Sequence, residues 1–332
     1  MTIIDAQVHA YEADHPGRPW AAVLTGPPSA NGPEMVAAMD AVGVDGAILV
    51  SAYTMYRYDP SFALDVYAQY PDRFGLVTPF DAADPAVGEK VADWAATDGT
   101  VGVRLLLAHG ISDAAGEAGI ANLLAAARHH DLPVNVYCTQ RHAQVAALVA
   151  EFPDVSLVVD HMGLVQPFHP PALEDGWAEL PNLLALAEHE NVAVKISGAG
   201  TLAHEPFPFA DIRDPVRRIL DAFGVARCMW GTDWTRAVEL LSYEQGVEAF
   251  RQGDWLSADE RGALMGGNAT WADNGFTMVS GGHGMDEHPD DVWMSPYDQT
   301  DRIEDAMNAY LDWEIALVDQ IERDGTTRFR RF

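Results

Sequence analysis

The chain has 332 residues, of which 48% are hydrophobic, so it can form a sizeable core, and a disordered chain is excluded. Fifty acidic residues against twenty basic ones give a formal net charge of −30. This charge repels phosphate backbones and anionic lipids, so we expect neither a nucleic acid nor a membrane surface as a partner.

The N-terminus and the cysteines bear on where the protein works. The first residues, MTIIDAQVHA, lack the basic start and apolar run of a secretory signal. No window approaches the roughly 18 consecutive apolar residues of a transmembrane helix. We therefore expect a cytoplasmic protein. Cys138 and Cys228 both fall inside apolar runs, which favours buried free thiols over a disulfide or a zinc pair.

Eight short apolar runs alternate with helical patterns, and continuous apolar strands are typical of a parallel sheet covered on both faces. The expected strands are 3–9, 46–51, 73–79, 101–107, 133–138, 155–160, 192–197 and 227–232. The expected helices are 33–41, 60–70, 85–96, 119–130, 140–151, 179–189 and 215–223. The alternation predicts an α/β fold, a (β/α)8 TIM barrel over residues 1–267. A doubly wound sheet is the alternative, but no Gly-rich loop follows the first strand to favour it.

The pattern changes after residue 267. Residues 268–296 are rich in Gly, Asp and His and show no period, whereas 299–324 have the pattern of one long acidic amphipathic helix. We therefore expect residues 268–332 to form a C-terminal extension, a loop followed by that helix. It would pack on the barrel or on a second subunit, and the second arrangement would make the protein a homo-oligomer.

The active site of a barrel lies at the C-terminal ends of its strands, so the residues there are the candidates for chemistry. In chain order they are Asp5, Gln7, His9, Arg57, Arg104, Tyr137, Arg141, His161, Lys195 and Asp233. Arginine grips carboxylates through two parallel hydrogen bonds. The cations at this face would therefore suit a small anionic organic substrate; they are Arg57, Arg104, Arg141, Lys195 and Arg236. Asp5 also has a structural interpretation, in which it orients the backbone beside the first strand.

Three short pieces carry a resemblance to a known family: IIDAQVH at the start, VVDHMG at 158–163 and MWGTDW at 229–234. In order and spacing they resemble the amidohydrolase superfamily of TIM-barrel hydrolases, and within it the branch that contains the dicarboxylate lactonases and related decarboxylases. The resemblance covers about residues 1–267. It implies that His161 is the sixth-strand histidine and that Asp233 is the catalytic aspartate.

Two positions depart from the family pattern. The family's first strand usually ends in Asp-x-His-x-His, and Gln7 stands in place of its first histidine. Tyr137 stands where metal-dependent members place a histidine on the fifth strand. The ligands that remain as candidates for a metal are His9, His161 and Asp233. The departures predict that no metal is required, or that one divalent ion such as Zn²⁺ or Mn²⁺ binds weakly. The lactonase branch, which works without a bound metal, pairs a strand-4 arginine with a strand-5 tyrosine, as Arg104 and Tyr137 would here.

The resemblance implies a hydrolase that opens a lactone or related cyclic ester of a carboxylated substrate. Asp233 would activate water as a general base, and His161 and His9 would donate hydrogen bonds to the developing oxyanion. The candidate substrate-binding residues are Gln7, Arg57, Arg104, Tyr137, Arg141 and Lys195.

Two other functions stay open. A metal-dependent decarboxylase of an aromatic or muconate-type acid could use the same barrel, although Tyr137 argues against it. A barrel that has lost catalysis and serves as a binding or assembly protein is the third hypothesis. Gln7 and the long extension support it, whereas the retention of both His161 and Asp233 argues against it.

Overall fold

The computed structural model describes most of the chain up to residue 278. The described residues are 1–278 except 24–25, 109–110, 113–115 and 273–274. The described residues belong to one compact unit. The long helix expected at 299–324 lies outside the described residues, so the extension stays a prediction.

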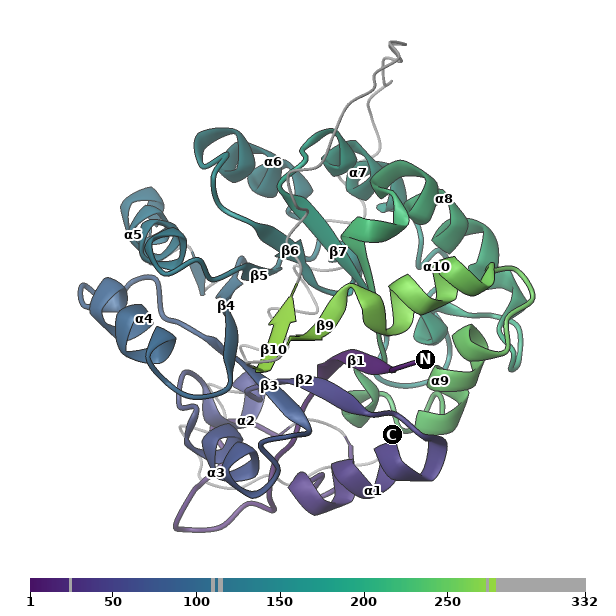
Figure 1. Ribbon diagram of the computed structural model, residues 1–332, viewed down its shortest axis with the longest axis horizontal. Helices are drawn as coiled ribbons and strands as arrows, with labels where there is room; N and C mark the ends of the chain where they lie inside the picture. Colours follow the sequence, from purple (N-terminus) through teal and green to yellow (C-terminus); the bar gives the residue numbers. More distant parts are fainter. Residues whose placement is uncertain (24–25, 109–110, 113–115, 273–274, 279–332) are drawn as a thin grey trace, which may run out of the picture. The chain divides into compact units, whose positions relative to one another are not determined.

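Eight parallel strands form one sheet in sequence order, β1 to β8 (Figure 1). They are β1 (Ile4–Val8), β2 (Gly46–Val50), β3 (Phe74–Pro79), β4 (Thr100–Leu106), β5 (Val134–Tyr137), β6 (Leu157–Val159), β7 (Val192–Ser197) and β8 (Cys228–Gly231). Nearly every residue in them is buried, as parallel strands covered on both faces require. Because β1 also contacts β8, the sheet closes on itself, and the predicted (β/α)8 barrel is confirmed.

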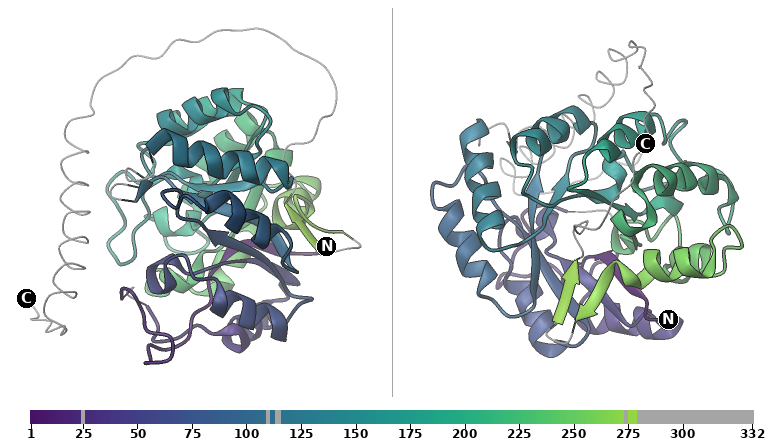
Figure 2. Two further views of the ribbon diagram at one scale, coloured as in Figure 1. Left: turned by 90° about the vertical axis from the view of Figure 1, so that its left-hand side faces the viewer. Right: turned by 45° about the horizontal axis from the view of Figure 1, so that its top comes forward.

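The larger helices lie around the outside of this ring of strands (Figures 1 and 2). They are α1 (Gly32–Val42), α3 (Ser61–Gln69), α4 (Val87–Ala95), α5 (Gly116–His129), α6 (His142–Glu151), α7 (Leu180–Ala185), α8 (Arg213–Phe223) and α9 (Tyr243–Arg251). The sequence patterns predict all of them except α9. Two short helices, α2 (Tyr53–Tyr56) and α10 (Ala258–Gly262), are also absent from the prediction.

Local signals set the ends of these helices. At α1 the Asn31 side chain accepts a hydrogen bond from the backbone of Glu34, and the Glu34 side chain returns one to the backbone of Asn31. Gly43 then ends the helix with a φ of +67°, a conformation that glycine adopts without strain. Ser242 with Gln245 and Ser257 with Glu260 form the same reciprocal cap at α9 and α10.

A two-stranded hairpin covers the N-terminal end of the barrel, where the sequence analysis predicts only a loop. Its strands, β9 (Ala269–Ala272) and β10 (Gly275–Met278), are antiparallel. Ala269 joins the apolar layer inside the barrel, formed by Ile4, Ala6, Ile48, Val50, Val77, Val101, Val158, Ala193 and Met229. This layer needs a cover at its open end, and the hairpin crosses it beside the N-terminus (Figure 2). The opposite end, where the strands finish, carries the polar residues.

Two predictions of the sequence analysis concern burial. Cys138 and Cys228 are both buried and free, as predicted. Among the residues that the structure describes, no helix combines the length and the apolar character that crossing a membrane requires.

Candidate active site

A buried carboxylate holds the seam where β1 meets β8. Asp5 Oδ1 accepts hydrogen bonds from the backbone N–H groups of Gln7, at 3.0 Å, and Thr232, at 2.9 Å. Asp5 Oδ2 accepts one from the Thr232 hydroxyl at 2.5 Å. The backbone N–H of Asp233 donates to the Gln7 carbonyl at 2.9 Å. Asp5 therefore orients the backbone beside the first strand and fixes Gln7 relative to Asp233.

Asp5 makes the free energy of unfolding depend on pH. Burial raises the pKa of Asp5 from 3.8 to about 6, against the opposing effect of its hydrogen bonds to Thr232 and Gln7. An acid with a raised pKa in the folded state contributes most stability below about pH 4, and that contribution is lost as the pH rises through about 6. Relative to Asp5→Asn, the wild type should lose up to about 3 kcal/mol of unfolding free energy between pH 4 and pH 7. Urea unfolding across this range measures the difference, and a constant difference would contradict the account.

Asp160 is the centre of a buried ion cluster with Arg104 and Lys195. It follows β6, and its Oδ2 accepts a hydrogen bond from Arg104 Nε at 2.8 Å. Its Oδ1 lies 3.3 Å from Lys195 Nζ, and all three side chains are nearly or fully buried. Burial opposes ionisation of Asp160, but Lys195 and Arg104 together lower its pKa to about 2. Two cations against one carboxylate leave the cluster with one uncompensated positive charge.

Lys195 extends this cluster to His9 through Gln7. Its ammonium group donates to Gln7 Oε1 at 2.8 Å. Because an ammonium can only donate, the amide NH2 of Gln7 must face the other way, toward His9 Nε2 at 3.3 Å. His9 Nδ1 lies 2.7 Å from the Val50 carbonyl, to which it donates. Gln7 thus has a defined place in the site, between a buried cation and a candidate catalytic histidine.

Asp233 lies between the two histidines. It follows β8 in the left-handed region with a φ of +49°, which is uncommon for a residue other than glycine. Its Oδ1 lies 3.3 Å from His9 Nε2 and its Oδ2 lies 3.6 Å from His161 Nδ1. The Arg236 guanidinium also donates to Oδ2. Burial alone would raise the pKa of Asp233, but Arg236 and His161 hold it well below its ordinary value, so the carboxylate is ionised.

His161 is oriented from both sides of its ring. Nδ1 lies 2.9 Å from the Ser197 hydroxyl, and Nε2 lies 3.4 Å from a terminal nitrogen of Arg104. Because arginine only donates, Nε2 is the acceptor, and the proton of the neutral ring belongs on Nδ1. Burial lowers the pKa of His161 to about 4, so the ring is neutral near pH 7. The Tyr137 ring lies 6.3 Å from the His161 ring.

The structure gathers most of the predicted site residues and places two of them in loops. Those that come together are Gln7, His9, Arg104, Tyr137, His161, Lys195 and Asp233. Arg57 follows α2 with a φ of +53°, and its guanidinium lies 5.1 Å from the centre of the Tyr53 ring. Arg141 precedes α6, where its guanidinium donates to Gln144 Oε1 at 3.3 Å.

The site also contains residues that the sequence analysis does not select. They are Asp160, Gln166 and Ser197. Arg236, one of the predicted cations at the strand ends, also lies in the site, against Asp233. A signal for Asp160 was present, because a lysine inside an apolar strand needs a buried counter-ion and Asp160 directly precedes His161. Arg236 and Gln166 are 70 positions apart, and no spacing rule relates them.

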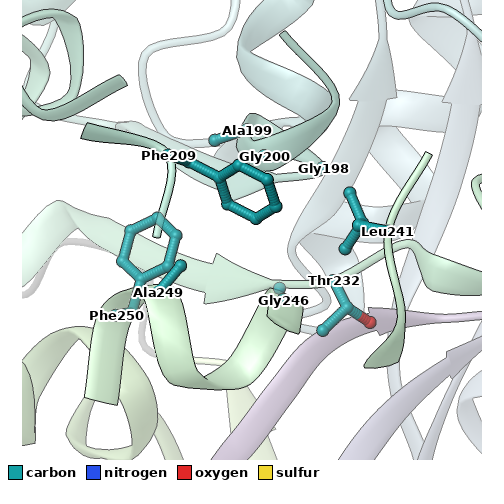
Figure 3. Close-up of a pocket in the computed structure, with 10 residues that line it drawn as sticks. Gly198, Ala199, Gly200, Phe209, Thr232, Leu241, Gly246, Ala249 and Phe250 are labelled. Atoms are coloured by element: carbon teal, nitrogen blue, oxygen red, sulfur yellow. The ribbon is translucent and has the colours of Figure 1, made fainter. Parts of the chain in front are cut away.

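A small cavity of about 10 Å³ lies behind β7 and β8, beside Thr232 (Figure 3). Phe209, Leu241 and Phe250 line it with apolar surface, and the Thr232 hydroxyl points away from it toward β1 (Figure 3). A space of this size holds about one water molecule. It is too small for a substrate.

The donor set does not fit a metal held by His9, His161 and Asp233. Within the described residues, no three His, Cys, Asp or Glu side chains converge as ligands. A guanidinium bonds Oδ2 of Asp233, and a second guanidinium faces Nε2 of His161. These fixed positive charges would repel a divalent cation.

The sequence over residues 4–270 matches the family model described as "Amidohydrolase". The chain therefore belongs to the amidohydrolase family, and the predicted family is confirmed. The match covers the barrel and both of the departures, Gln7 and Tyr137.

Two relatives and one further solved structure are similar to this chain. An L-fucono-1,5-lactonase from Burkholderia ambifaria is 29% identical over 153 residues, 42% of this chain and 49% of the relative. The chain thus spans about half the length of this curated relative. A solved structure from Pseudomonas putida, described as a candidate 2-pyrone-4,6-dicarboxylic acid hydrolase, is 26% identical with a TM-score of 0.62 and covers 80% of this chain and 94% of that one. A Burkholderia multivorans amidohydrolase solved with bound zinc is 24% identical with a TM-score of 0.62, covering 80% and 97%, and shows the shared fold.

Proposed function

We propose that the protein hydrolyses a lactone or related cyclic ester, with Asp233 as the general base. The observation that carries this proposal is Asp233 Oδ1, a buried carboxylate oxygen without a hydrogen-bond partner among the described residues. It lies beside His9 at the end of the barrel where active sites form. The lactonase and pyrone-dicarboxylate hydrolase relatives support the same class of reaction.

In this mechanism Asp233 Oδ1 takes a proton from water while the water oxygen attacks the lactone carbonyl carbon. The carbonyl oxygen becomes an oxyanion, which needs positive charge nearby. The Nδ1 protons of His9 and His161 face the Val50 carbonyl and Ser197, so these two rings orient the site and do not donate to the oxyanion. Arg104, 3.4 Å from His161, adds positive charge at this point. The ring C–O bond then breaks, and Asp233 returns the proton to the leaving oxygen. The product is a hydroxy acid.

The charge of the site favours a carboxylated substrate. The Arg104–Lys195–Asp160 cluster carries one uncompensated positive charge in a buried setting, where an anion gains most from it. Tyr137 adds an aromatic wall beside Arg104, whose guanidinium lies 5.7 Å from the ring centre. A small organic acid that contains a lactone ring would match both features.

We expect Arg104→Met to raise KM for a lactone that carries a carboxylate by about tenfold, because the cluster loses its excess positive charge. KM for a neutral sugar lactone should rise less. The comparison of steady-state constants for the two substrates checks this prediction. Equal effects on both substrates would assign Arg104 to holding His161 and Asp160 instead.

The proposal is tested by following ring opening of small lactones by NMR. The panel contains 1,5-lactones of sugars and 2-pyrone-4,6-dicarboxylate, the substrates named for the relatives. Ring opening by the wild type that Asp233→Asn lacks would support the proposal. A parallel incubation with an aromatic carboxylic acid tests the decarboxylase, which release of CO2 would favour. Binding without turnover would favour the non-catalytic barrel.

A further inference from the structure

Arg236 makes a set of contacts that the proposed mechanism does not use. It ends the short turn Trp234–Arg236 directly after Asp233, and only 8% of its surface is exposed. Its Nε donates to Asp233 Oδ2. A guanidinium buried against a catalytic carboxylate controls how that carboxylate is oriented. The hydrogen bond holds one carboxylate oxygen in place and limits rotation of the carboxylate plane.

The other nitrogens of Arg236 tie it to the loop after β6. One terminal nitrogen donates to the Pro167 carbonyl at 3.0 Å, and the other donates to Gln166 Oε1. The guanidinium also lies 5.3 Å from the centre of the Phe168 ring. Gln166 Nε2 in turn donates to the Ser197 carbonyl at 2.8 Å. Arg236 thus joins the loops that follow β6 and β8, and Gln166 links it to the end of β7.

Gly198 makes room for this arrangement. It has a φ of +69°, and a Cβ atom there would overlap Gln166 Oε1 and the Arg236 guanidinium. A side chain at this position would therefore separate Gln166 from Arg236. The close contact depends on a residue without a side chain.

The two carboxylate oxygens of Asp233 therefore differ in their hydrogen-bond partners. Oδ2 accepts a hydrogen bond from Arg236, while Oδ1 lies 3.3 Å from His9 and has no hydrogen-bond partner among the described residues. We propose that Arg236 is a positioning residue that holds Asp233 by Oδ2 so that Oδ1 is the oxygen that receives the proton from water. This inference rests on the proposed lactone hydrolysis.

The experiment compares Arg236→Ala and Arg236→Lys with the wild type on whichever lactone of the panel the wild type opens. Misplacing a catalytic group by about 1 Å costs about 100-fold in rate, so kcat of Arg236→Ala should fall about 100-fold. KM should change by less than about threefold, because all three guanidinium nitrogens of Arg236 are already bonded to Asp233, Pro167 and Gln166. Guanidinium chloride at millimolar concentration should restore part of kcat in Arg236→Ala. Arg236→Lys should keep more activity than Arg236→Ala, because it keeps one donor.

Two further variants separate positioning from stability. Arg227 is also a partly buried arginine that donates to backbone carbonyls, those of Ala187, His189, Val192 and Phe223. Arg227→Ala should lower the melting temperature and leave kcat unchanged. Gln166→Met keeps Arg236 and removes one of its anchors, so a smaller loss of kcat is expected. It serves as the test if Arg236→Ala fails to fold.

Three results would overturn the inference while the proposed function stands. They are wild-type kcat in Arg236→Ala, a loss that lies wholly in KM, and a loss that guanidinium does not reverse in any part. If the Arg236 variants do not fold and Gln166→Met does, a kcat in Gln166→Met equal to that of the wild type would overturn the inference. If the wild type opens no lactone of the panel, the proposed function fails, and the inference fails with it.

Discussion

Asp233→Asn should lower kcat for lactone opening by about 10²–10⁴-fold, the range that loss of a general base produces. The amide keeps the volume and shape of the carboxylate, but it cannot accept the proton at Oδ1. Arg236 keeps its bonds to Gln166 and Pro167, so the chain should still fold. Steady-state kinetics with the NMR assay, together with a thermal melt of each protein, measure both expectations.

The matched control is Asp254→Asn. Asp254 is 87% exposed and pairs with Arg213 at 3.3 Å on the surface, so the same chemical change there should leave kcat unchanged. Wild-type kcat in Asp233→Asn would remove Asp233 from the mechanism. A loss of kcat in both variants would point to the assay or the overall charge.

Asp160→Asn should cause the largest loss of stability. Asp160 is fully buried and neutralises both Arg104 and Lys195, so its removal leaves two buried cations without a counter-ion. Breaking a buried pair by removing one partner costs about 3–5 kcal/mol. Chemical denaturation should show this loss of unfolding free energy.

Two further variants test why Asp160→Asn is destabilising. Asp84 pairs with Lys90 on the surface, so Asp84→Asn should change stability little. The double variant of Asp160→Asn with Lys195→Met removes one orphaned cation together with the carboxylate. It should be more stable than the sum of the two single effects predicts. Strict additivity would show that the buried charges do not interact.

Much of the barrel could be predicted from the sequence, because a strand buried on both faces is a continuous apolar run whatever it packs against. Two omissions have physical reasons. The region that contains α9 has a helix signal in Ser242 and Gln245, a capping box that the apolar pattern alone does not reveal. The hairpin strands β9 and β10 have four residues each, too few for a period to show.

The site residues, like the helices and strands, could be predicted only in part. His9, His161 and Asp233 could be selected because each follows a strand, and closing the barrel brings the strand ends together. Arg104 and Lys195 could also be selected, but their pairing with Asp160 could not, because it depends on side-chain direction inside the barrel. Nor could the contact of Arg236 with Gln166, because it depends on how two loops fold over the strand ends.

Gln7 shows why a departure from a family pattern needs a structure to interpret it. From the sequence alone, Gln7 is interpreted as the loss of a metal ligand. In the structure its oxygen accepts from Lys195 and its amide group faces His9, so a buried ammonium group lies close to the histidine. Gln7 therefore binds the Lys195 side chain where the family pattern has a metal ligand, which is consistent with catalysis by the residues alone.

The most direct test of the account is ring opening of the lactone panel by wild-type protein before and after treatment with a chelator, with metal content measured on the same samples. The account predicts ring opening at the same rate in both samples, and its loss in Asp233→Asn. A rate that falls with the chelator and returns with added Zn²⁺ or Mn²⁺ would contradict it. So would a wild type that opens none of these lactones.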